Sequence, residues 1–287
     1  MSALDRRLNA FRPDLADKRL MGRVEAERFV AGEPAVIAAP VADLHSAPDA
    51  GARIDTQLLH GETIQVFERK DGWAWVQAAR DGYVGYVDEA AVGRPLAAPT
   101  HLVCVPRSFV YPEPELKAPM TTVHSMGARL AVAGEAEKRG TRYALLTSGE
   151  AMIARHLCPI GRHADDFVSV AEQFLHTPYL WGGTSGFGID CSGLVQLPML
   201  MAGRNVPRDT DMQAEGIGAA LDPENGLKRG DLVFWRGHVA IMTDGEHVIH
   251  ANGHTMTVSR EPLGEAIRRI EPLYGMPTGY RRLVVAL

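Results

Sequence analysis

The sequence around Cys191 is that expected for a cysteine whose sulfur acts as a nucleophile. It follows the glycine-rich run 182–190 and precedes an apolar pattern of helical spacing. Because glycine adopts positive φ angles at little cost, the run predicts tight turns that deliver Cys191 to the first turn of a helix. There the unpaired backbone N–H groups and the positive end of the helix dipole favour a thiolate and can hold an oxyanion. Lone cysteines are more often small buried residues, so a catalytic role also requires a base.

Two histidines could supply that base and its orienting partner. A cysteine nucleophile needs a general base, and the base needs a group that fixes its orientation. His238 begins an apolar stretch of β character, and His250 lies in the next such stretch. The turn at 244–246 between them predicts two antiparallel strands, which can bring the imidazoles side by side. The sequence therefore predicts that Cys191, His238 and His250 act together.

Residues 163–287 contain the elements that must position these side chains. A helical pattern begins after Asp165 or Asp166, either of which could be its N-cap, and a second helical pattern begins near Cys191. The strands expected after the turn region 223–230 are 231–235, 238–243, 247–251 and 255–259. Helices leading into an antiparallel sheet are typical of an α+β domain.

The residues before 163 show a different sequence pattern. Residues 31–97 alternate short apolar stretches with glycine and Asp-Gly turns, which predicts a small all-β barrel. The same pattern recurs more faintly at 98–158 and predicts a second barrel, followed by a short linker at 159–163. Residues 1–30 are arginine-rich and too polar to bury themselves. We therefore expect an N-terminal arm that packs against another part of the protein.

The composition narrows the class of protein. Apolar residues make up 46 % of the 287, which is ample material for packed cores. The formal net charge of −5 disfavours a nucleic-acid partner. Three widely spaced cysteines fit a reducing compartment. No run of about 18 apolar residues and no secretory signal is visible, so we expect no membrane span and a cytoplasmic location.

The motifs of residues 163–287 resemble those of the NlpC/P60 family of papain-like cysteine peptidases. In the order of the family they are PYLWGG (178–183), DCSGL (190–194), PRDT (207–210), GDLVFW (230–235), HVAI (238–241) and IHA (249–251). Residues 31–97 are similar to bacterial SH3-like domains. The resemblance implies an α+β protein with a papain-like NlpC/P60 catalytic domain at 163–287, preceded by two small SH3-like β-barrels.

Two such barrels before this domain resemble the γ-D-glutamyl-L-diamino-acid endopeptidases of peptidoglycan stem peptides. The resemblance implies that Cys191 is the nucleophile, His238 the general base and His250 the orienting residue. It places Tyr179 near the oxyanion and implies recognition of a free N-terminal L-alanine. The residues implied for substrate binding are Glu62, Tyr83, Trp181, Asp190, Ser192 and Thr210, which stands where the family has serine.

We therefore expect a cytoplasmic cysteine endopeptidase that hydrolyses the γ-D-glutamyl-L-diamino acid bond of murein-derived peptides, in murein peptide recycling. No cofactor, metal, nucleic acid or membrane partner is expected. Arg208 is the candidate ligand of the D-glutamate α-carboxylate, because of its charge and its place near Thr210. The oligomeric state and the identity of the diamino acid are not predicted.

Three other interpretations fit the same residues. Cys191, His238 and His250 could form a zinc site with one cysteine and two histidine ligands. The barrels could bind cell-wall fragments while the peptidase domain is inert. An amidase or acyl transferase could use the same three residues, because the acyl-enzyme is shared and only the acceptor differs.

Overall fold

The chain divides after Ile160 into two units, residues 1–160 and 161–287. The division falls inside the segment 159–163 that the sequence predicted as a linker. The computed structural model describes residues 4–94 and 97–283. The outer ends of the predicted arm and catalytic domain, residues 1–3 and 284–287, lie outside the described residues, as do residues 95–96 near the end of the predicted first barrel.

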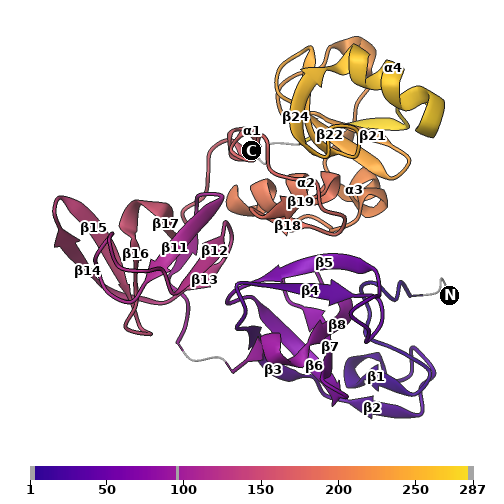
Figure 1. Ribbon diagram of the computed structural model, residues 1–287. Coiled ribbons are helices and arrows are strands. Elements are labelled where there is room, and N and C mark those ends of the chain that lie inside the picture. The colour runs from indigo at the N-terminus through magenta and orange to yellow at the C-terminus, as the bar shows by residue number, and fades with distance from the viewer. Residues whose placement is uncertain (1–3, 95–96, 284–287) are drawn as a thin grey trace. The chain divides into compact units, whose positions relative to one another are not determined.

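Residues 33–93 contain a seven-stranded sheet of short strands (Figure 1). Its strand order is β5-β4-β8-β7-β6-β3-β9. Alternate residues face one apolar core, which holds Leu44, Leu58, Ile64 and Val76. The elements are β3 (Glu33–Ile37), β4 (Val41–His45), β5 (Ile54–Leu59), β6 (Thr63–Lys70), β7 (Trp73–Ala78), β8 (Val84–Asp88), η2 (Glu89–Ala91) and β9 (Val92–Gly93).

The hairpin formed by β6 and β7 shows why Asp-Gly pairs occur in the turns of this region. Lys70 pairs with Trp73 across a two-residue loop. The loop residues Asp71 and Gly72 both have positive φ angles, 51° and 81°. Such a loop matches the twist of the flanking strands, and Asp-Gly is one of its preferred sequences. The local sequence therefore favours this hairpin.

The arginine-rich arm packs against the first barrel. It contains β1 (Leu15–Asp17), η1 (Lys18–Leu20) and β2 (Arg28–Val30), and the two strands are parallel. Leu15 is buried in one cluster with Phe67 and Trp75. The Arg12 guanidinium lies 4.4 Å from the centre of the Trp75 ring. The arm thus packs on the surface of the first barrel.

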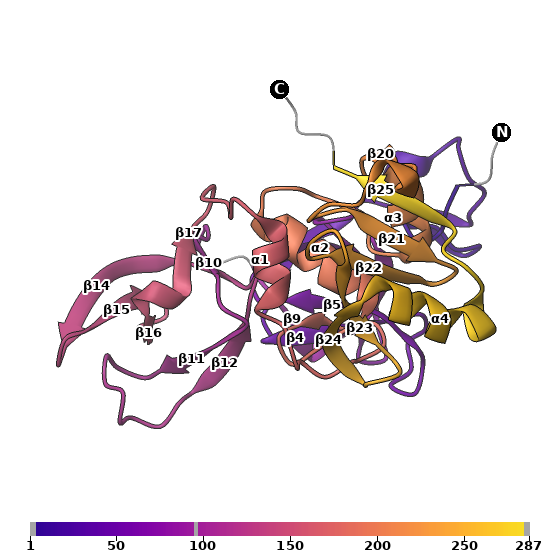
Figure 2. The same ribbon diagram turned by 90° about the horizontal axis from the view of Figure 1, so that it is seen from above.

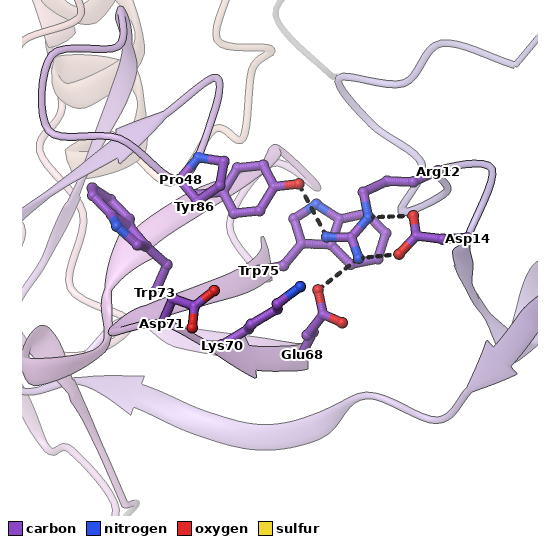
Figure 3. Close-up of a pocket in the computed structure, with 9 residues that line it drawn as sticks. All are labelled: Arg12, Asp14, Pro48, Glu68, Lys70, Asp71, Trp73, Trp75 and Tyr86. Atoms are coloured by element: carbon purple, nitrogen blue, oxygen red, sulfur yellow. Dashed lines mark hydrogen bonds and ion pairs between the residues drawn. The ribbon is translucent and has the colours of Figure 1, made fainter.

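A pocket of about 310 Å³ lies where the arm meets the first barrel (Figure 3). Arg12 donates hydrogen bonds to Asp14 at 2.8 Å, Glu68 at 2.6 Å and the Tyr86 hydroxyl at 3.0 Å. The charge of Arg12 is therefore neutralised inside the pocket. None of the predicted site residues lines this pocket.

Residues 101–159 form two further sheets that share an apolar core. The strand orders are β12-β11-β16-β15-β14 and β13-β10-β17. Val103, Val110, Leu130 and Met152, which come from both sheets, are buried together. The elements are β10 (His101–Val103), β11 (Arg107–Tyr111), β12 (Thr122–Ser125), β13 (Arg129–Leu130), β14 (Val132–Lys138), β15 (Thr141–Leu146), β16 (Ala151–Ile153), η3 (Ala154–His156) and β17 (Leu157–Pro159).

The second unit is built on a six-stranded sheet of order β20-β25-β21-β22-β23-β24, in which neighbouring strands are antiparallel. The strands predicted at 231–235, 238–243 and 247–251 lie side by side at its centre. The strands of the unit are β18 (Thr184–Ser185), β19 (Gly188–Ile189), β20 (Ala219–Ala220), β21 (Leu232–Trp235), β22 (His238–Met242), β23 (His247–Asn252), β24 (Thr257–Pro262) and β25 (Gly279–Arg282).

Helices cover this sheet, and α4 lies beside β24 in both views (Figures 1 and 2). Ala266 and Ile270 of α4 pack against Val233, Met242 and Val248 of the sheet. Helix α2 contacts β22 and β23. The helices are α1 (Phe167–Glu172), α2 (Cys191–Met201), α3 (Thr210–Gly216), η4 (Pro223–Asn225) and α4 (Leu263–Tyr274). Among the described residues, no helix combines the length and apolar character that crossing a membrane would require.

The structure corrects the predicted layout at the C-terminal side. Helices α3 and α4 and strand β25 were not predicted from the sequence. Strand β24 begins at Thr257 instead of residue 255, because the Asn252 side chain accepts hydrogen bonds from the backbone N–H groups of His254 and Thr255. These bonds hold residues 253–256 in a turn, and Met256 there has a φ of 54°.

Candidate active site

Strands β18 and β19 bring the glycine-rich run against the start of α2. A Cβ on Gly193 would lie 2.4 Å from the carbonyl oxygen of Gly183, and a Cβ on Gly183 would lie 2.5 Å from that of Gly188. Only glycine permits these two close approaches. Asp190 is the N-cap of α2 and accepts a hydrogen bond from Gly193 N–H at 2.7 Å. Cys191 is thus the first residue of the helix, as the sequence predicted.

The Cys191 sulfur lies against the backbone on either side of His238. Sγ is 4.0 Å from the carbonyl oxygen of Gly237 and accepts a hydrogen bond from the Val239 N–H. It also lies 3.9 Å from Oγ1 of Thr210, at the start of α3. Cys191 is 8 % exposed. The sulfur therefore faces the beginning of β22, where His238 stands.

Burial and, to a smaller extent, the neighbouring Asp190 carboxylate together raise the pKa of the Cys191 thiol to about 11. Burial, together with the neighbouring His250 and Arg269, lowers the pKa of His238 to about 3. Burial therefore opposes the thiolate that the helix start was expected to favour in the unliganded protein. At neutral pH both groups are uncharged, because desolvation outweighs the favourable helix start.

The structure brings the two predicted histidines together. Ile241 pairs with Ile249 and Met242 with Val248 across β22 and β23. Continuing this register places His238 and His250 diagonally across the two strands, within reach of long side chains. Nε2 of His238 is 2.9 Å from Nδ1 of His250. Because Nε2 of His238 contacts His250, Nδ1 is the nitrogen of His238 that can interact with the Cys191 sulfur.

Two residues at this site were not selected from the sequence. Nε2 of His250 is 2.7 Å from Oε1 of Glu261 on β24, and Arg269 of α4 forms an ion pair with the same oxygen. His250 itself is fully buried, with 0 % exposure. No local motif marks Glu261, because its partners His250 and Arg269 lie on two other elements, β23 and α4. A search for a carboxylate on the strand following His250 could have found it.

Asp190 and Ser192 form a buried network with Arg208. The Arg208 guanidinium donates to both carboxylate oxygens of Asp190, at 2.6 and 3.1 Å, and to Ser192 Oγ at 2.6 Å. Arg208 is 1 % exposed. The expectation that Arg208 binds a substrate carboxylate is therefore wrong, because this guanidinium is buried on an internal carboxylate. Substrate binding by Asp190 and Ser192 stays a prediction.

Three further predicted residues lie around the start of α2 in the second unit. Tyr179 is half-buried, and burial together with the nearby Cys191 raises the pKa of its hydroxyl. Trp181 is 59 % exposed, so its ring is available on the surface. Thr210 lies beside the sulfur. Of Tyr179, Trp181 and Thr210, Thr210 is the residue with a side-chain atom in contact with the Cys191 sulfur.

Glu62 and Tyr83 lie in the first unit. Oε1 of Glu62 accepts a hydrogen bond from Arg80 at 2.7 Å, and both side chains are buried. Oε2 of Glu62 is buried without a hydrogen-bond partner among the described residues. Burial raises the pKa of Glu62 even though Arg80 opposes the shift. Tyr83 packs in the core of the first barrel and is 3 % exposed, so its substrate contact stays a prediction.

The geometry argues against the zinc interpretation. Nε2 of His238 and Nδ1 of His250 face each other at hydrogen-bonding distance, so these two nitrogens cannot also point at one shared metal ion. No group of three or more His, Cys, Asp or Glu side chains suited to a metal ion occurs in residues 4–94 and 97–283. The sulfur lies instead against the backbone on either side of His238, whose ring contacts His250.

Two family models match the chain. Residues 44–92 match the bacterial dipeptidyl-peptidase SH3 domain, and residues 176–269 match the NlpC/P60 family. The second match includes Cys191, His238 and His250.

Known proteins and a solved structure are similar to this chain. A γ-D-glutamyl-L-lysine dipeptidyl-peptidase of Bacillus cereus is 29 % identical over 240 residues, which cover 74 % of this chain and 71 % of the relative. The probable endopeptidase NlpC of Escherichia coli is 38 % identical over 108 residues, 33 % of this chain and 69 % of the relative. The crystal structure of an NlpC/P60 family protein from Bacillus cereus has a TM-score of 0.73 and 26 % identity, covering 88 % of this chain and 100 % of that one.

Proposed function

This chain belongs to the NlpC/P60 family of cysteine peptidases, and we propose that it hydrolyses the amide bond between the γ-carboxyl of D-glutamate and an L-diamino acid in peptidoglycan-derived peptides. One observation carries the chemistry. The sulfur of Cys191 lies against the backbone around His238, whose ring is held by His250 at 2.9 Å.

In the proposed reaction the Cys191 thiol gives its proton to Nδ1 of His238, and the sulfur attacks the γ-carbonyl carbon. Backbone N–H groups at the start of α2, with Tyr179 nearby, stabilise the oxyanion. The His238 imidazolium then protonates the leaving amine as the C–N bond breaks, leaving a thioester on Cys191. Water attacks the thioester while His238 takes its proton. The carboxylic acid leaves, and the proton returns to the sulfur.

The name of the Bacillus cereus relative supports a γ-D-glutamyl substrate.

We propose that the first unit recognises a free N-terminal L-alanine through Glu62. The support is the buried oxygen Oε2 of this residue, which has no hydrogen-bond partner among the residues that the structure describes. An ammonium group would supply the missing donor and offset the cost of the buried carboxylate. Action in cytoplasmic murein recycling stays a prediction.

The test is hydrolysis of synthetic L-Ala-γ-D-Glu-meso-diaminopimelate and of the same peptide with L-Lys, followed by mass spectrometry of the released dipeptide. We expect L-Ala-γ-D-Glu to appear with the wild-type protein and to be lost, by about a thousandfold or more, with Cys191→Ala. Absence of any cleavage of either peptide would refute the proposed activity. Equal cleavage of the peptide with an N-acetylated alanine would refute recognition of the free amine alone.

A further inference from the structure

Both ring nitrogens of His250 are occupied inside the protein. Nδ1 faces Nε2 of His238 at 2.9 Å, and Nε2 faces Oε1 of Glu261 at 2.7 Å. Arg269 binds the same carboxylate oxygen from α4. Four side chains from β22, β23, β24 and α4 therefore form one continuous series of polar contacts that begins next to Cys191.

The sheet register places this series on one face. Glu261 pairs with Val248, and His250 is two residues from Val248 on the same strand. Cross-strand partners and alternate residues point to the same side of a sheet. Val248 packs against Ile270 of α4, so this is the face that α4 covers. Arg269 precedes Ile270 in that helix.

The chemistry of a carboxylate determines where the protons lie in this series. An ionised carboxylate only accepts hydrogen bonds, so Nε2 of His250 must carry a proton. With a single proton on its ring, His250 then has an unprotonated Nδ1, which can accept a hydrogen bond. His238 then donates from Nε2, and its Nδ1 is the nitrogen without a proton. That is the nitrogen that can take the proton of Cys191.

The charges around Glu261 keep it ionised. Burial raises the pKa of Glu261, but the hydrogen bond with His250 and the charge of Arg269 hold it below its ordinary value. The charged and titratable groups facing this carboxylate are His250 from β23 and Arg269 from α4. The groups that act on His238 are His250 of β23 and Arg269 of α4, and the centre of the Trp235 ring lies 5.7 Å from that of the His238 ring.

We propose that Glu261 is a positioning residue of the catalytic site, which sets the tautomers of both histidines so that His238 presents an unprotonated Nδ1 to Cys191. Arg269 holds the Glu261 carboxylate in place. The inference rests on the proposed function, because it assigns Cys191 and His238 their catalytic roles. It adds a carboxylate and a guanidinium to that machinery.

The experiment measures three properties of the full-length protein with Glu261→Ala, Glu261→Gln, Arg269→Ala and Arg269→Lys. These are the imidazole tautomers by ¹⁵N NMR, the rate of Cys191 alkylation by iodoacetamide against pH, and the thermal midpoint. In the wild type we expect protons on Nε2 of both His238 and His250. Glu261→Ala should lose this single tautomer and slow alkylation about tenfold near neutral pH. The loss should shrink at alkaline pH, where hydroxide takes the proton.

Glu261→Gln separates orientation from charge. Its amide oxygen can still accept from His250, so we expect the tautomers to be kept and alkylation to fall by less than with alanine. Arg269→Ala should show a smaller loss that Arg269→Lys restores. Arg260→Ala is the matched control, because Arg260 is exposed on the same strand and pairs with Asp244. We expect it to match the wild type within about twofold.

The inference is overturned if Glu261→Ala keeps the wild-type tautomers and pH profile, or if His250 carries protons on both nitrogens. A protein that cleaves no γ-D-glutamyl peptide would refute the proposed substrate, while the alkylation and NMR results would still decide the role of Glu261. Peptide cleavage that is unaffected by Glu261→Ala would refute the positioning role alone.

Discussion

Cys191 experiences two opposing electrostatic effects. Its place at the first turn of α2 favours a negative sulfur, as reactive cysteines at helix starts do. Burial and the Asp190 carboxylate oppose this and raise the pKa of the thiol to about 11. The resting site therefore holds a neutral thiol and a neutral His238 imidazole. Proton transfer between them belongs to the reaction, where substrate and oxyanion contacts can compensate the separated charges.

This neutral resting state predicts the pH dependence of alkylation. A raised thiol pKa reduces the thiolate fraction at any given pH, so the rate at Cys191 should increase continuously from about pH 6 to about pH 10. Peptide mapping after iodoacetamide treatment distinguishes Cys191 from Cys104 and Cys158, which are more exposed. A plateau already reached near pH 7 would instead indicate a stable thiolate–imidazolium pair and contradict the neutral state.

The start of α2 is held by a contact between distant elements. Asp190 caps the helix, and its carboxylate also binds Arg208, which precedes α3. Arg208 is 1 % exposed, and Asp190 and Ser192 are among the groups that compensate its buried charge. Removing one partner of a buried ion pair leaves the other uncompensated. The network therefore couples the position of Cys191 to the segment before α3.

Arg208→Ala should therefore lower the free energy of unfolding by about 3–5 kcal/mol, measured by urea denaturation. Arg204→Ala is the control, since Arg204 is exposed in the same loop and should change stability by less than about 0.5 kcal/mol. Equal effects of the two substitutions would show that the buried pair does not stabilise this region. Peptide cleavage should fall with Arg208→Ala, because the cap of α2 loses its support.

The whole chain consists of two units that carry different proposed tasks. The second unit holds the thiol and both histidines, whereas Glu62 belongs to the first barrel. If binding of the N-terminal amine and bond cleavage are divided in this way, a substitution in the first unit should change substrate affinity without changing the reactivity of the sulfur. The arm and its pocket, in contrast, hold none of the predicted site residues.

Glu62→Gln tests this division. A lost charged hydrogen bond is worth about 1.5–3 kcal/mol, so KM for a peptide with a free L-alanine should rise about 10- to 100-fold. Cys191 alkylation should change by less than about twofold. Glu89→Gln is the control, as an exposed carboxylate on the same barrel. A fall in alkylation that parallels the fall in cleavage would place the effect of Glu62 on the fold instead of on binding.

The sequence by itself determined the local features: the hairpins at Asp-Gly turns, the helix that starts at Cys191, and the strands that carry His238 and His250. These depend on neighbouring residues, whose spacing is visible along the chain. Helices α3 and α4 were not predicted, and neither has a side-chain hydrogen bond at its N-cap. The apolar residues of α4 do recur with helical spacing, so this helix could have been found from the sequence. Only the tertiary structure showed that Arg208 binds Asp190, that Glu261 and Arg269 lie next to His250, and that burial opposes ionisation of the sulfur. Side-chain partners and desolvation arise from packing between distant elements, and sequence spacing does not record them.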